Sequence, residues 1–328
     1  MLLAGDVGGT KSLLGLFAPA PQRPRPVTVE SFPTQQYPSL LAMIDEFLHR
    51  QAGGRPPIDA ACFGVAGPVI DDEAELTNVG WRVDGRAVAL AFGLARCRLL
   101  NDLVAIAHSV SVLESGELHA LQEGVPNVSG NAGLIAAGTG LGQAFLFNDG
   151  RHLVPAPSEG GHADFAPRTP REWELTMWLV DRFGRAEVEH VVSGLGLQNL
   201  YHFTHPEPCR DLDPSATESD LPRIVSRNAM RGSCLRCRRA LDLFVDAYGS
   251  ESGNVALRSV ATRGLYIGGG IAPKILPALE SGAFREAFTS KPPMEELLRT
   301  IPIRVILNAQ AGLLGAATVA NSELAGTS

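Results

Sequence analysis

Short apolar runs alternate with glycine-rich turns and amphipathic stretches along this chain. Residues 2–5 and 13–17 are apolar and flank the turn 6–10, a pattern that predicts strand, turn and strand. Apolar side chains recur at helical spacing over residues 40–48, after a Pro-Ser pair suited to a helix start. The N-terminal region therefore predicts both strands and a helix.

The rest of the chain continues this alternation. Further strands are predicted at residues 60–65, 97–100, 134–137, 264–267 and 303–307, and another runs through Phe147. Helices are predicted at residues 104–113, 312–324 and over most of 170–262, interrupted by a polar, Pro-rich loop at 204–222. Alternating strands and helices predict an α/β fold with a parallel or mixed sheet.

A unit of strand, glycine-rich turn and strand occurs near residue 6 and again near residue 140. The chain has 328 residues, more than one hydrophobic core usually serves. We therefore expect two related lobes, with ligands at the carboxyl ends of the strands.

Composition narrows the function classes. The net charge is −7 and the arginines are dispersed, so nucleic acid is not an expected partner. No apolar run is long enough for a membrane helix, and the first residues do not resemble a signal peptide, so we expect a cytoplasmic protein. Five widely spaced cysteines indicate reduced thiols.

Three glycine-rich turns are candidate nucleotide contacts. Asp6-Val7-Gly8-Gly9-Thr10 and Gly138-Thr139-Gly140-Leu141-Gly142 let backbone N–H groups approach phosphates, although a tight hairpin is the simpler explanation for the first. Gly268-Gly269-Gly270 would let a flat ring lie close to the backbone, or is a plain strand–helix turn. The first turn is not a Walker A loop, because its spacing and the Lys-Ser/Thr ending are wrong.

Polar residues among apolar or glycine-rich segments form a second candidate set. Asn101-Asp102 follows a predicted strand, and Glu159, His162 and Glu189 lie further along the chain. Such side chains alternate donors and acceptors, as a polyhydroxyl ligand requires. Asp102 is the candidate base for a hydroxyl that attacks phosphorus. The alternatives are a helix N-cap for Asp102 and a solvated helix face for Glu189.

Two other chemistries have less support. Cys234 and Cys237 form a C-x-x-C pair, but no second pair at a suitable spacing completes a zinc site, so both are expected to be core or groove residues. The sequence therefore predicts no metal cage of protein side chains, although Asp6 could hold Mg²⁺ through water. A serine hydrolase is not supported, because the G-x-S-x-G elbow is absent.

An ordered set of segments resembles the bacterial ATP-dependent glucokinases, in the hexokinase branch of the actin-like ATPase superfamily. The set spans nearly the whole chain, and its order is more specific than any single loop. The matching segments are Gly5-Asp6-Val7-Gly8-Gly9-Thr10, Leu76-Thr77-Asn78, Asn101-Asp102, residues 137–142, residues 159–167, Ser193-Gly194-Leu195-Gly196-Leu197 and Gly268-Gly269-Gly270-Ile271.

The resemblance implies a two-lobed actin-like (ribonuclease H-like) fold with a cleft between the lobes. The small α/β lobe would comprise residues 1–105 and 305–328, and the larger α+β lobe residues 106–304. It further implies ATP and Mg²⁺ as cofactors, glucose as the substrate in the first step of glycolysis, and a homodimer.

The resemblance also implies roles for individual residues. Asp102 would take the proton of the sugar 6-hydroxyl. The implied sugar contacts are Asn78, Asn101, Asp102, Glu159, His162 and Glu189. The implied nucleotide contacts are Gly5, Asp6, Val7, Gly8, Gly9, Thr10, Gly138, Thr139, Gly140, Gly268, Gly269 and Gly270.

Three rival functions are considered. One is a kinase for mannose, fructose or an amino sugar, because sequence alone does not place the 2- and 4-hydroxyls. A second is a non-catalytic, sugar-responsive repressor, for which no DNA-reading module is expected before residue 5. A third is a filament-forming or chaperone ATPase of actin-like fold, in which the sugar residues would have no use.

Overall fold

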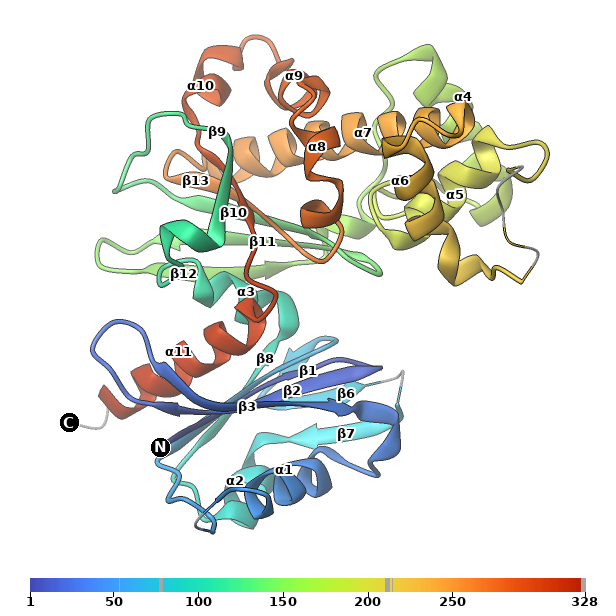
Figure 1. Ribbon diagram of the computed structural model, residues 1–328. Coiled ribbons are helices and arrows are strands. Elements are labelled where there is room, and N and C mark those ends of the chain that lie inside the picture. The colour runs from blue at the N-terminus through green and yellow to red at the C-terminus, as the bar shows by residue number, and fades with distance from the viewer. Residues whose placement is uncertain (53, 77–78, 210–212, 214, 326–328) are drawn as a thin grey trace. The chain divides into compact units, whose positions relative to one another are not determined.

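The computed structural model describes residues 1–52, 54–76, 79–209, 213 and 215–325 (Figure 1). It divides into two compact units. Unit 1 comprises Met1–Ser115 and Asn308–Ser328, and unit 2 comprises Gly116–Leu307. Both junctions lie later in the chain than the resemblance implied. The expected boundary at residue 105 would fall inside helix α3 (Asp102–Ser109), which is continuous.

Unit 1 is built on a five-stranded mixed sheet in the order β3-β2-β1-β4-β8. The sheet strands are β1 (Leu2–Val7), β2 (Lys11–Ala18), β3 (Arg25–Pro33), β4 (Ala60–Val65) and β8 (Cys97–Asn101). A smaller antiparallel sheet contains β5 (Val69–Ile70), β6 (Glu73–Leu76) and β7 (Trp81–Asp84). The helices are η1 (Thr34–Gln36), α1 (Leu40–His49), α2 (Gly85–Phe92), α3 and α11 (Ala311–Ala325).

Strand β1 is buried on both faces. The alternation of its side chains between the two faces of the sheet decides on which face Asp6 lies. Leu3 and Val7 belong to the core that includes α1, whereas Leu2 and Ala4 belong to the core formed with α11. Because side chains alternate along a strand, Asp6 shares the α11 face with Leu2 and Ala4. Figure 1 shows α1 and α11 on opposite faces of this sheet.

Unit 2 contains a six-stranded mixed sheet in the order β12-β11-β10-β13-β14-β9. Its strands are β9 (Leu118–Gln122), β10 (Ala132–Ala137), β11 (Leu141–Asn148), β12 (Leu153–Ser158), β13 (Gly264–Gly268) and β14 (Ile303–Ile306). Its α-helices are α4 (Pro170–Phe183), α5 (Gly194–Thr204), α6 (Leu221–Met230), α7 (Leu235–Ser259), α8 (Leu276–Leu279), α9 (Ala283–Thr289) and α10 (Glu295–Thr300). The 3-10 turns are η2 (Ser115–Glu117), at the junction of the units, and η3 (Gly160–His162), η4 (Glu218–Asp220) and η5 (Ala272–Ile275).

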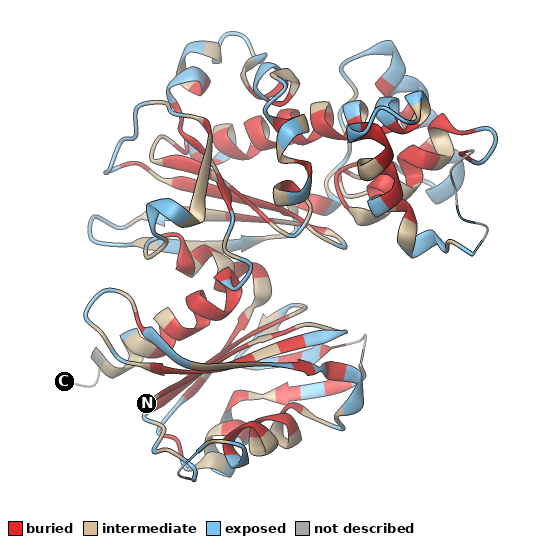
Figure 2. Cartoon of the chain, viewed as in Figure 1, coloured by how far each residue is buried: buried red, intermediate tan, exposed pale blue. Residues whose placement is uncertain are grey.

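Helix α7 is the central helix of unit 2. It is buried along much of its 25-residue length, as Figure 2 shows, and it contacts β10 and β11 as well as α5, α6 and α9. The apolar core around it therefore joins the sheet to the helical part of the same unit. None of the helices in the described part of the chain is both long and apolar enough to cross a bilayer.

Candidate functional site

The first glycine-rich turn links β1 and β2 in unit 1. The Gly8 amide donates to the Lys11 carbonyl over 3.2 Å, and a Cβ atom at Gly8 would lie only 2.8 Å from that oxygen. The Thr34 hydroxyl donates to the Gly8 carbonyl over 2.7 Å and so holds the turn from the other side. Hydrogen bonds to the backbone of Gly8 thus hold the turn in place, and the side chain of Thr10 is exposed.

Asp6 and Asp102 are close enough to influence each other. Strands β1, β4 and β8 are parallel, and Val7, Val65 and Asn101 are aligned in register, so the carboxyl ends of all three strands lie at one edge. Burial, followed by the nearby Asp102 carboxylate, raises the pKa of Asp6 to about 6. The fold therefore places two of the predicted site carboxylates together.

Gly312, in the first turn of α11, lies against the Asp6 carboxylate. A Cβ atom at residue 312 would come within 2.8 Å of Asp6 Oδ2. Gly312 was not among the site residues predicted from the sequence. The two residues are 306 positions apart in the sequence, so their contact can be recognised only once the sheet face of Asp6 is known.

Asn101, not Asp102, caps helix α3. The Asn101 side-chain oxygen accepts hydrogen bonds from the amides of Leu103 (3.0 Å) and Val104 (3.4 Å). Its Nδ2 atom donates to the Gly67 carbonyl over 3.0 Å. The alternative that Asp102 is an N-cap is therefore wrong by one residue. Asp102 is the first residue of the helix, and its Oδ1 accepts from the Leu103 amide over 2.8 Å.

The second glycine-rich turn links β10 and β11 in unit 2. Gly138 donates its amide to the Gly140 carbonyl over 2.9 Å, and the Gly194 amide donates to the Gly138 carbonyl over 2.8 Å. The Glu189 carboxylate accepts from the Leu141 amide over 2.7 Å. Glu189 lies in a turn before α5, so the alternative of a solvated helix face is wrong. Instead, this carboxylate holds the turn between β10 and β11.

Gly268-Gly269-Gly270 lies beside that second turn. Strands β10 and β13 are parallel, with Ala136 opposite Gly268, so both segments follow the same edge of the sheet. Gly269 has a φ of +83°, and a Cβ atom there would lie 2.3 Å from the Ala137 carbonyl oxygen. Glycine is therefore required at residue 269 both by backbone conformation and by space.

A cavity of about 600 Å³ opens next to the triglycine segment, within unit 2. Leu197 of α5, Ile271 and Ile275 give it apolar walls, and Arg227 and Lys274 contribute positive charge. Apolar walls combined with cationic groups suit a ligand that carries both a flat ring and phosphates.

The segment Glu159-Gly160-Gly161-His162 forms the turn η3 against β11. A Cβ atom at Gly161 would lie 2.1 Å from the Leu141 carbonyl oxygen, so the two glycines allow close packing. Glu159 and His162 are both exposed. The Glu189 amide donates to the Gly161 carbonyl over 2.8 Å, which joins this turn to Glu189.

Glu187 is a second residue that sequence reasoning missed. Its Oε2 atom lies 2.9 Å from Nδ1 of His162, and this hydrogen bond raises the pKa of His162 and lowers that of Glu187. No sequence signal marked it, because its pairing with His162 depends on the fold. Among the other predicted site residues, Asn78 lies outside the described residues.

Each unit thus gathers its own part of the predicted set. Unit 1 groups the first turn with Asn101 and Asp102 at one sheet edge. Unit 2 groups the second turn, the triglycine segment, Glu189 and η3 around the ends of β10, β11 and β13.

Comparison with known proteins identifies the family. A family model described as Glucokinase matches residues 3–323. A glucokinase of Synechocystis is 39% identical, with 97% of each chain covered, and one of Nostoc punctiforme is 39% identical, with 98% of each covered.

Solved structures agree with the sequence comparisons. A glucokinase from an Antarctic psychrotroph has a TM-score of 0.86 at 28% identity, over 98% of each chain. A ROK family glucokinase of Streptomyces griseus shares the fold, with a TM-score of 0.66 at 20% identity over 98% of this chain and 99% of its own. The α/β class expected from the sequence is confirmed, and the chain belongs to the glucokinase family, a family of ATP-dependent sugar kinases.

Proposed function

We propose that this protein transfers the γ-phosphoryl group of ATP to O6 of glucose, giving glucose 6-phosphate and ADP. The observation that carries the proposal is the family match over residues 3–323, within which each predicted turn lies at the end of a strand. Phosphoryl transfer depends mainly on positioning and electrostatics, which backbone turns of this kind supply.

Asp102 is the proposed general base. As O6 attacks the γ-phosphorus, the hydroxyl proton passes to the Asp102 carboxylate, and the bond between the γ-phosphorus and the bridging oxygen breaks to release ADP. Asp102 is the first residue of α3 and follows strand β8, so its carboxyl group lies at the sheet edge that also carries the first glycine-rich turn.

The proposed nucleotide contacts are the three glycine-rich turns. The second turn and Gly268–Gly270 lie along one edge of the unit 2 sheet, and the cavity next to Ile271 and Lys274 provides room for adenosine. Asp6 suits a water-mediated contact to Mg²⁺, because it is a carboxylate at a strand end next to a turn that suits phosphate. The bound ion would neutralise phosphate charge.

The proposed sugar contacts are Asn101, Asp102, Glu159, His162 and Glu189, with Asn78 as a further candidate. Their donors and acceptors suit a polyhydroxyl ligand. Asn101 already accepts two backbone hydrogen bonds through its oxygen, so we expect it to reach the sugar through Nδ2. Glu187 acts through His162, whose Nδ1 it holds.

The finer fold assignment belongs to the same proposal. We infer that the two units are the lobes of an actin-like ATPase fold. We further predict a homodimer, which the molecular mass in solution would test, and a cytoplasmic location, which cell fractionation would test.

The deciding experiment measures ADP release by the purified protein with Mg-ATP and a panel of hexoses. The panel contains glucose, mannose, fructose, galactose and N-acetylglucosamine. Turnover with glucose alone supports both the reaction and the sugar. Turnover with another hexose retains the kinase mechanism and replaces the substrate. Turnover with none of them contradicts the proposal and favours a sugar-binding regulator.

A further inference from the structure

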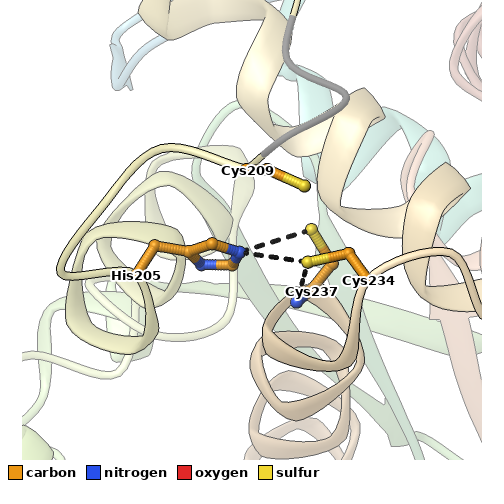
Figure 3. Close-up of side chains that lie close together, drawn as sticks. All are labelled: His205, Cys209, Cys234 and Cys237. Carbon is orange, nitrogen blue, oxygen red and sulfur yellow. Dashed lines mark hydrogen bonds between the residues drawn. The ribbon is translucent and has the colours of Figure 1, made fainter.

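Four metal-ligating side chains converge in unit 2, away from the glycine-rich turns. His205, Cys209, Cys234 and Cys237 place their donor atoms within 4.8 Å of one another, and Figure 3 shows their side chains directed toward a common point. His205, Cys209 and Cys237 are buried, and Cys234 is partly buried. The cluster joins the segment after α5 to the start of α7.

The spacing of the donor atoms matches a tetrahedral zinc site. Zn–S bonds of about 2.3 Å and Zn–N bonds of about 2.0 Å at tetrahedral angles put sulfur and nitrogen about 3.5 Å apart. His205 Nε2 lies 3.5 Å from Cys234 Sγ and 3.6 Å from Cys237 Sγ. Both distances are therefore close to the spacing of two ligand atoms on one tetrahedral zinc ion.

The imidazole of His205 is oriented for metal binding. Its Nδ1 atom lies 3.0 Å from the Tyr201 carbonyl oxygen, which can accept the ring proton and so leave the lone pair on Nε2. The Tyr201 ring stacks on the imidazole at 4.1 Å between centroids. Metal-bound histidines typically donate their other ring nitrogen to a carbonyl or carboxylate in this way.

The sulfur atoms also have polar neighbours suited to thiolates. The Cys237 amide lies 3.5 Å from Cys234 Sγ, and Cys234 is the N-cap of α7, where the helix dipole favours negative charge. Asn228 of α6 places Nδ2 3.8 Å from Cys209 Sγ. Such donors offset the negative charge that thiolates would bring into a buried site.

We propose that His205, Cys209, Cys234 and Cys237 bind a structural Zn²⁺ ion. Three thiolates and one imidazole form a soft, closed, tetrahedral ligand set, which favours zinc over the oxygen-seeking Mg²⁺. Binding displaces one proton from each of the three thiols to solvent and forms three Zn–S bonds and one Zn–N bond.

From the sequence, Cys234 and Cys237 were expected to be core or groove residues, because no second cysteine pair lies at a suitable spacing. The other two ligands come from His205-x-x-x-Cys209, a mixed histidine and cysteine pair that lacks the C-x-x-C signature. The ion would join the segment after α5 to α7, and through Asn228 to α6, which lines the 600 Å³ cavity.

The first test is the metal content of the untagged, full-length protein, purified without chelator from cells grown with added zinc. We expect close to one zinc per chain. Replacement by Co²⁺ should give the strong visible bands of a tetrahedral ion and a thiolate-to-cobalt charge-transfer band. Absence of both bound zinc and the cobalt spectrum would overturn the proposal, and stoichiometric iron in place of zinc would overturn the choice of metal.

Variants test the individual ligands. Cys234→Ser and His205→Gln should each lower zinc affinity at least about tenfold, whereas His205→Cys should retain the ion. Cys97→Ala is the matched control, because Cys97 is a buried thiol in unit 1 and should leave the zinc content unchanged. Full zinc retention by both Cys234→Ser and His205→Gln would contradict the assignment. If a variant fails to fold, the cobalt spectrum of the wild-type protein still decides whether the site binds a metal ion.

Discussion

The Oε2 atom of Glu187 lies 2.9 Å from Nδ1 of His162. The carboxylate therefore fixes which ring nitrogen of this exposed histidine carries the proton, and leaves Nε2 to meet a ligand. His162 was predicted from the sequence as a sugar contact, but the residue that orients it was not. This pairing makes Glu187 a candidate positioning residue for the predicted sugar contact at His162.

Replacing Glu187 with Gln should lower the pKa of His162. The folded-state pKa of His162 is raised by this hydrogen bond, so the stabilisation from the pair is present below the unfolded pKa and is lost as pH rises through the folded one. An NMR titration of the imidazole measures the change. Asp164→Asn is the control. Asp164 forms an ion pair with Arg185 (2.9 Å), and Arg185 also approaches Glu187 (3.5 Å). The control therefore removes a nearby carboxylate while the hydrogen bond between Glu187 and His162 is retained. An unchanged His162 titration in Glu187→Gln would contradict the assigned role.

Replacing Asp102 with Asn should remove the proposed base and leave the fold intact. We expect kcat with glucose to fall by about 10²–10⁴-fold, because general base catalysis commonly contributes that much. Steady-state kinetics and circular dichroism together separate lost chemistry from lost structure. A variant that keeps more than about a tenth of the wild-type rate would exclude Asp102 as the base.

Replacing Asp6 with Asn should stabilise the free protein at pH 8 but not below pH 4. Because the folded pKa of Asp6 is about 6, above the unfolded value of 3.8, its carboxyl favours folding when protonated, and this contribution is lost as pH rises through 6. The resulting gain in the free energy of unfolding at pH 8 is at most about 3 kcal/mol. Urea unfolding at several pH values measures it.

Asp181→Asn provides the comparison for Asp6→Asn, because Asp181 is an exposed carboxylate on α4. We expect it to change the free energy of unfolding at pH 8 less than Asp6→Asn does, because its side chain is exposed. Equal stability of wild type and Asp6→Asn at pH 5 and at pH 8 would contradict the shifted pKa.

Replacing Gly269 with Ala should destabilise unit 2. The φ of +83° and the Ala137 oxygen 2.3 Å from the new Cβ both oppose a side chain, and the backbone strain alone costs about 1–3 kcal/mol. Gly270→Ala is the matched control, since a Cβ atom there meets no atom within 4 Å. Thermal unfolding should separate the two variants. Similar melting temperatures would show that the segment adapts.

Helices and strands that carry a clear local pattern in their own sequence were predicted well. Strand β4 has the predicted bounds, and α1 begins after the Ser39 N-cap, as its apolar spacing and cap predict. Helix α3 begins two residues before its prediction, because Asn101 provides the cap. These segments carry a clear apolar period or capping residue, which the sequence displays directly.

Edge strands and contacts between distant segments were missed. Strand β3 is largely exposed or half-buried, so it lacks a continuous apolar run. Strand β12 contains Pro155 and Pro157, which disfavour a strand prediction but are tolerated at the edge of a sheet. Two contacts arise only when the chain folds: Glu187 pairs with His162, and His205 approaches Cys237. No local sequence pattern predicts either contact.

The Glu189 carboxylate, described above as an anchor of the Leu141 amide, has a consequence for substrate discrimination. If a sugar hydroxyl also binds this carboxylate, a poorly fitting hexose will disturb the turn that is proposed to hold the ATP phosphates. Binding of a wrong sugar would then weaken the binding of ATP. We expect the enzyme to show substrate synergism, in which each substrate raises the affinity for the other.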